Sequence, residues 1–171
     1  MNIRDIVLIG LLSAATTAGK LALSFLPNIE IVTLLFMVFT VSLGRKRSLF
    51  LSIVFVTTEI LIYGFSTWVI GYYIVWPLLV LITSFFSRKL KSEYGYAIIA
   101  GLFGLSYGFL FAVVESFFYG PAYGLTYWLK GLTFDMVHGV SNFIIVLFLF
   151  QPLNRVLTKQ AERFLNPESR S

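Results

Sequence analysis

The chain has 171 residues, of which 58% are hydrophobic and only 12% charged, and its net charge is +5. Soluble domains are about a quarter charged, and a protein of this size has too much surface for its volume to hide so many apolar side chains from water. The composition therefore excludes a soluble domain and favours a membrane protein. The absence of cysteine excludes disulfides and thiolate metal sites.

Six apolar segments follow one another along the chain, and each is expected to be a helix because irregular backbone cannot face lipid. We predict them at residues 6–26, 30–44, 48–64, 68–86, 96–118 and 125–150. Turn residues separate several of them, at Leu26-Pro27-Asn28, Gly44 and Gly120-Pro121. A polar cytoplasmic tail is expected from about residue 155. The predicted fold is a single all-α domain over residues 1–171, a bundle of six transmembrane helices.

Lys and Arg lie on alternate connections between these segments, and such connections normally face the cytoplasm. Eleven of the 13 basic residues follow this pattern: Arg4, Arg45, Lys46, Arg47, Arg88, Lys89, Lys91, Arg155, Lys159, Arg163 and Arg170. The connections at 27–29, 65–67 and 119–124 contain neither Lys nor Arg. The sequence therefore predicts a multi-pass protein with both ends in the cytoplasm, and the basic clusters indicate topology rather than nucleic-acid binding.

Ionisable residues inside the apolar segments are costly in lipid, so each is a functional candidate. They are Lys20, Glu59, Glu115, Lys130, Asp135 and His138, with Glu30 at the start of the second segment. Nearly all fall in the outer half under the predicted topology, together with aromatic residues: Trp68, Tyr72, Tyr73, Trp76, Tyr119, Tyr123, Tyr127 and Trp128. An aromatic belt at the headgroups explains single rings, but the inner face has only Tyr94 and Tyr96. We therefore expect some outer rings to line a solute-binding cavity that opens to the outside.

Structural roles remain open for the same residues. Lys130 could neutralise Glu59 or Glu115 and hold helices together without touching a ligand. Asp135, His138 and Asn142 fall on one helix face at i, i+3 and i+7. A hydrogen-bonded seam between helices explains this stripe at least as well as a ligand site, and for His138 we favour the seam.

Enzymatic readings have little support. Gly104-Leu105-Ser106-Tyr107-Gly108 matches GxSxG, and His138 lies on the next segment. That motif needs a strained turn, however, and here it falls inside an apolar helix, where Gly and Ser serve packing. One histidine without cysteine makes a metal site improbable, and no phosphate-binding loop is present. We expect no catalytic residue, no metal, no cofactor and no ATPase site in this chain.

Ala14 and Ala18, four residues apart in the first segment, form a smooth patch where another helix can approach closely. This patch, the segments 26–35 (LPNIEIVTLL) and 135–142 (DMVHGVSN), and the six-segment layout resemble the substrate-binding S component of energy-coupling factor (ECF) transporters. The resemblance covers essentially the whole chain and is closest to the subgroup associated with cobalamin uptake. Folate, pantothenate or a pyrimidine precursor stay open as ligands.

The resemblance implies a subunit of a bacterial plasma-membrane importer that captures a vitamin outside, docks on a membrane scaffold subunit driven by two cytoplasmic ATPases, and topples to release its cargo. Ala14 and Ala18 would be the docking contact. The implied substrate-binding residues are Asn28, Glu30, Glu59, Trp68, Tyr72, Glu115 and Lys130. The alternative is a stand-alone secondary transporter or channel for a small solute, and a non-transporting interaction protein comes third.

Overall fold

The computed structural model describes residues 1–165, and over that range the chain forms six helices and no strand. The helices are α1 (Ile3–Ala22), α2 (Val32–Leu43), α3 (Arg45–Tyr63), α4 (Thr67–Ser87), α5 (Glu93–Tyr119) and α6 (Pro121–Leu165). Four of them, α1, α4, α5 and α6, are long and apolar enough to cross a membrane. The all-α fold predicted from the sequence is confirmed, and its long apolar helices are compatible with a multi-pass membrane protein.

The two remaining helices fall short of a membrane span for different reasons. α3 begins with three consecutive basic residues and also contains Glu59, so it carries more charge than an ordinary span. α2 has 12 residues, which at about 1.5 Å per residue reach roughly 18 Å, against a hydrocarbon core of about 30 Å. α2 contacts all five other helices, and most of its side chains are buried. It is therefore the central helix of the bundle, enclosed by protein.

Local sequence signals explain where the helices begin and end. Asn2 and Asp5 form a capping box at the start of α1, which ends at Ala22, four residues before the predicted end at Leu26. Gly44 has φ 84°, in the left-handed region that favours glycine, so the chain turns directly from α2 into α3. α3 accordingly begins at Arg45 rather than at residue 48.

The predicted polar tail is largely helical. α6 is a single helix of 45 residues that continues to Leu165, well beyond the predicted end at 150. The guanidinium of Arg4 donates a hydrogen bond to the Leu165 carbonyl, 3.4 Å away, so the start of α1 lies beside the end of α6. Residues 166–171, including Arg170 of the predicted tail, lie outside the described residues.

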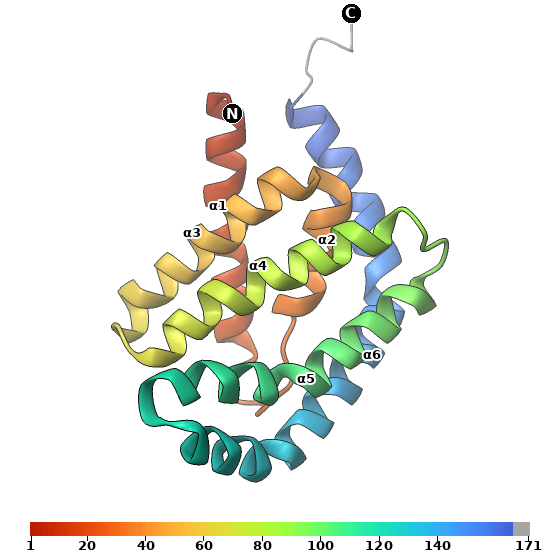
Figure 1. Ribbon diagram of the computed structural model, residues 1–171. Coiled ribbons are helices and arrows are strands. Elements are labelled where there is room, and N and C mark those ends of the chain that lie inside the picture. The colour runs from red at the N-terminus through yellow and green to blue at the C-terminus, as the bar shows by residue number, and fades with distance from the viewer. Residues whose placement is uncertain (166–171) are drawn as a thin grey trace, which may run out of the picture.

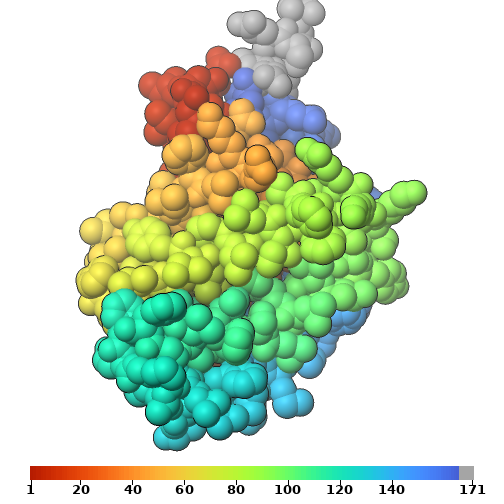
Figure 2. Space-filling model, viewed as in Figure 1, coloured from red at the N-terminus to blue at the C-terminus, as the bar shows by residue number. Residues whose placement is uncertain are grey.

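The start of α1 and the end of α6 lie together at one end of the molecule, in the upper part of Figure 1, whereas the loop after α1 and the turn between α5 and α6 lie in its lower part. α5 and α6 pack as a close hairpin because glycines face each other across it. A Cβ on Gly104 would lie 2.8 Å from the Gly139 Cα, so a larger residue would force the helices apart. Figure 2 shows α3 and α4, in yellow to green, side by side across one face, with α5 below them.

Candidate ligand-binding site

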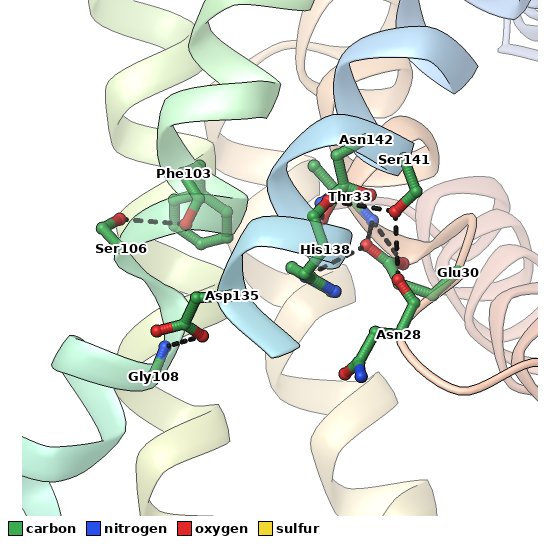
Figure 3. Close-up of polar contacts among 10 residues, drawn as sticks. All are labelled: Asn28, Glu30, Thr33, Phe103, Ser106, Gly108, Asp135, His138, Ser141 and Asn142. Carbon is green, nitrogen blue, oxygen red and sulfur yellow. Dashed lines mark hydrogen bonds and ion pairs between the residues drawn. The ribbon is translucent and has the colours of Figure 1, made fainter. Parts of the chain in front are cut away.

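The loop between α1 and α2 is held in place by both of its neighbours. Asn28 has φ 61°, a left-handed conformation that asparagine tolerates better than most residues. The Ser141 hydroxyl of α6 donates to the Asn28 carbonyl at 3.0 Å. The Glu30 carboxylate accepts the backbone N–H of Thr33 at 2.9 Å, which places a negative charge at the start of α2 (Figure 3). The loop is thereby fixed between α2 and α6.

Two adjoining cavities lie around this loop. Cavity A has a volume of about 470 Å³ and lies between the loop, α5 and the first part of α6. Cavity B has a volume of about 180 Å³ and lies among the loop, α1, α2, α4, α5 and α6. Asn28 and Tyr107 line both, so the two cavities share a wall. The short α2 explains the hollow, because a helix that ends well short of the bilayer thickness leaves room beyond its end.

Cavity A is lined mainly by aromatic and hydrogen-bonding groups. Its lining residues are Asn28, Tyr107, Gly108, Tyr123, Thr126, Tyr127, Lys130, Gly131, Phe134 and Asp135. A mainly apolar cavity with a few polar groups converging on it is typical of a small-molecule site. Its volume falls within the range of about 300–1,000 Å³ that such sites have.

Cavity B has a higher density of charge. Its lining residues are Lys20, Asn28, Glu30, Val32, Tyr72, Trp76, Tyr107 and His138. The side-chain nitrogens Trp76 Nε1 and His138 Nε2 are buried and find no hydrogen-bond partner within residues 1–165. A buried polar atom without a hydrogen-bond partner is costly, and both of these belong to residues of the cavity wall.

Lys20 is held by an acid and by aromatic rings at the wall of cavity B. Its ammonium group forms an ion pair with Glu59, whose side chain is fully buried. The same nitrogen lies 4.9 Å from the ring centre of Tyr63 and 5.1 Å from that of Tyr72, with Trp68 at 5.8 Å. A cation over several ring faces is stabilised by their negative π-clouds. This arrangement holds a positive charge at the wall of cavity B.

Asp135, His138 and Asn142 form the seam that the sequence suggested. The Gly108 backbone N–H donates to the Asp135 carboxylate at 2.9 Å, which joins α5 to α6. The Asn142 amide donates to the Thr33 hydroxyl at 3.2 Å, which joins α6 to α2. His138 packs on the Tyr107 ring, with centroids 4.8 Å apart, and its Nε2 lies 3.8 Å from Glu30. Asp135 and His138 also line the cavities, so the stripe lies at a helix contact and at a cavity wall together.

Four of the seven residues that the resemblance implied line a cavity: Asn28, Glu30, Tyr72 and Lys130. Glu59 and Trp68 lie one contact further out, around Lys20. Glu115 lines neither cavity, and its carboxylate accepts a hydrogen bond from the Thr67 hydroxyl at 2.9 Å.

The ion pair that we considered for Lys130 is wrong, because Glu59 is paired with Lys20. Lys130 has no carboxylate within ion-pair distance in the described part of the chain. Several cavity residues were not assigned to the site from the sequence: Lys20, Trp76, Tyr107, Tyr123, Tyr127, Asp135 and His138. Six of these had been singled out as ionisable residues in apolar segments or as outer aromatics, and His138 among them had been favoured for the seam. Tyr107 had been considered only as a variable position of the GxSxG motif.

The GxSxG motif serves packing, as expected. The Ser106 hydroxyl donates to the Phe103 carbonyl of its own helix at 2.9 Å, and Figure 3 shows it turned away from His138. Gly104 faces Gly139, and a Cβ on Gly108 would collide with the Asp135 carboxylate. The two glycines therefore permit the close contact of α5 with α6.

The small residues of α1 lie on its outer face. Ala14 and Ala18 are both exposed, and so is Gly10, one turn earlier on the same face. An added Cβ at Gly10 would meet nothing within 4 Å. α1 thus presents three small residues at four-residue spacing to its surroundings, which is a surface that another helix can approach closely.

Comparisons of the chain with protein-family models, curated proteins and solved structures found no match.

Proposed function

We propose that this chain is the substrate-binding S component of an ECF-type importer, which captures a vitamin from outside the cell and delivers it through a scaffold subunit and two ATPases. The observation that carries the proposal is the pair of cavities around Asn28 and Tyr107. They are built from five helices and a fixed loop, and two of their lining residues, Trp76 and His138, have a buried side-chain nitrogen without a hydrogen-bond partner in the described part of the chain. The loop lies away from the start of α1 and the end of α6 (Figure 1). A site of this kind suits capture of a polar solute with aromatic or apolar parts.

All six helices cross the bilayer in this proposal, with both ends in the cytoplasm. The alternation of basic residues supports this orientation, and so does the position of the start of α1 beside the end of α6 (Figure 1). The short α2 can take part because it is enclosed by the other helices, and irregular backbone at membrane depth is tolerated where it lies within protein or lines a cavity. The loop at residues 27–31 would meet that condition.

Docking on the scaffold would use the exposed face of α1 around Ala14 and Ala18. The exposure of both alanines supports the proposal, since a contact surface must be free in the isolated subunit. Close helix contact over small residues is favourable in lipid, where no hydrophobic force drives association.

Cobalamin is the ligand that we propose first. It is much larger than a cavity of about 470 Å³, so only part of it would be enclosed and the rest would project outside. A smaller vitamin would fit entirely within cavities A and B. The two cases differ in how many of the cavity residues a bound ligand would touch.

The proposal is tested by separating binding from transport. The purified chain in detergent should bind one of the candidate vitamins without ATP, and equilibrium dialysis with radiolabelled vitamins measures this. Proteoliposomes containing the chain alone should show no accumulation, whereas those that also contain the scaffold and both ATPases should take up the vitamin with ATP. Gradient-driven accumulation by the chain alone would overturn the proposal in favour of a secondary transporter.

A further inference from the structure

A cavity of different chemistry lies at the basic end of the molecule, where α3 begins and α4 ends. It has a volume of about 560 Å³ and is lined by Arg45, Leu81, Ser84, Phe85, Arg88 and Lys89. Half of the lining residues are cationic and none is acidic. They come from the first residue of α3, the last two turns of α4 and the turn that follows, so two separate helix ends build the hollow.

The three cations of this cavity are not neutralised by the protein. Arg45, Arg88 and Lys89 have no carboxylate within ion-pair distance among residues 1–165. Arg47 provides the contrast, because its guanidinium is paired with Asp5 at 2.8 Å and also donates to the Leu43 carbonyl. Two residues of the basic cluster of α3 thus differ: Arg47 is held in an internal ion pair, whereas Arg45 lines the cavity.

An exposed apolar stripe leads away from the cavity along α4. Leu81 and Phe85, which line the cavity, are 45% and 65% exposed, and Ile74 on the same helix face is 50% exposed. Residues seven and four apart lie on one face of a helix. The Lys89 ammonium lies over the Phe85 ring, 5.5 Å from its centre, so the stripe and the cations meet. The end of α4 and the turn into α5 form the green right-hand edge of the face in Figure 2.

We propose that this surface binds one anionic phospholipid. The phosphate of the headgroup lies in the basic cavity and accepts hydrogen bonds from Arg45, Arg88 and Lys89, and an acyl chain follows Leu81 and Ile74 along α4. Charge complementarity selects an anionic headgroup, and basic hollows between membrane helices are suited to such groups. The apolar stripe that continues from the cavity selects a lipid over a soluble phosphate, which would leave that stripe unused.

The experiment titrates the delipidated protein in detergent with phosphatidylglycerol and counts bound lipid by native mass spectrometry. The wild-type chain should bind one molecule saturably. The triple variant R45Q/R88Q/K89Q should bind it on the order of 100-fold more weakly, at about fivefold for each charge removed near a membrane surface. The control R155Q/K159Q/R163Q has the same net charge but alters exposed residues of α6, and it should keep the wild-type affinity.

Several outcomes would overturn the proposal. Equal weakening in both triple variants would mean general attraction to a positive protein. Equal binding of phosphatidylcholine would mean that the headgroup charge is not recognised, and full competition by an equimolar amount of glycerol phosphate would identify a soluble-anion site. If the triple variant is not monodisperse, the single variant R88Q is titrated with phosphatidylglycerol in its place. Binding about fivefold weaker than in the wild type supports the proposal, and unchanged affinity refutes it.

Discussion

Replacing Lys20 with methionine should leave the Glu59 carboxylate buried without its partner. Glu59 is fully buried, and its second oxygen already lacks a hydrogen-bond partner within residues 1–165, so the Lys20 ammonium group is the main partner of this carboxylate. Breaking a buried ion pair by removing one partner costs about 3–5 kcal/mol. Because the Lys20 side chain is 24% exposed, we expect the lower end, about 3 kcal/mol, which corresponds to a Tm lower by about 6–12 °C in a protein of this size.

The assay measures thermal unfolding in detergent, with tryptophan fluorescence as the signal, for the wild type, the two single variants and the double variant of a double-mutant cycle. The double variant Lys20→Met/Glu59→Gln removes both charges and should regain most of the lost stability, with a coupling energy of about 2 kcal/mol. Lys159→Met makes the same chemical change at an exposed position of α6 and should alter stability by less than about 0.5 kcal/mol. A single variant as stable as wild type, or a double variant as unstable as the two single effects added together, would refute the reasoning.

Three further predictions concern the helix contacts and the cavities. Gly104→Ala should lower the free energy of unfolding by about 1–3 kcal/mol, because the new Cβ would lie 2.8 Å from the Gly139 Cα. Gly10→Ala adds a Cβ in open space and should raise the free energy of unfolding by up to about 1 kcal/mol. Chemical unfolding of both variants checks this prediction. Ala14→Trp should abolish ATP-driven uptake in the reconstituted complex and leave vitamin binding by the isolated chain intact; lost binding would assign Ala14 to the fold. Lys130→Ala should raise the Kd for the vitamin about tenfold at unchanged Tm, since Lys130 faces cavity A without an ion pair, and an unchanged Kd in equilibrium dialysis would contradict its role.

Composition and apolar periodicity were sufficient to predict the helices as a class. Long apolar runs with few charges are expected to be helices in lipid, so the number and order of the helices in the described residues followed from the sequence. The packing of α5 on α6 could also be predicted from the sequence, because small residues such as Gly104 and Gly139 mark close helix contacts. Helix ends were less accurate: α6 continues to Leu165 because its polar last turns keep good helix formers after the apolar run ends.

The choice of partners within the site could not be predicted from the sequence. Lys20 and Lys130 are both cations inside predicted apolar segments, and the sequence alone does not show which of them pairs with Glu59. The packing of α1 against α3 brings Lys20 to Glu59. The cavity itself depends on α2 being only 12 residues long. The predicted segment 30–44 is longer because it includes Glu30 and Ile31, which precede the helix, and Gly44, which follows it. Tyr107 was missed because its direction depends on how α5 is rotated against α6.

The central claim, that cavity A holds the transported molecule, is tested most directly by filling it. Gly131 lines cavity A, and an added Cβ there meets nothing within 4 Å, so Gly131→Trp places a large ring in the hollow without a clash at its base. Met136→Trp, at a 63% exposed position of α6 outside both cavities, is the matched control. Vitamin binding measured by equilibrium dialysis should be lost in Gly131→Trp and kept in Met136→Trp; wild-type affinity in a folded Gly131→Trp variant would contradict the account.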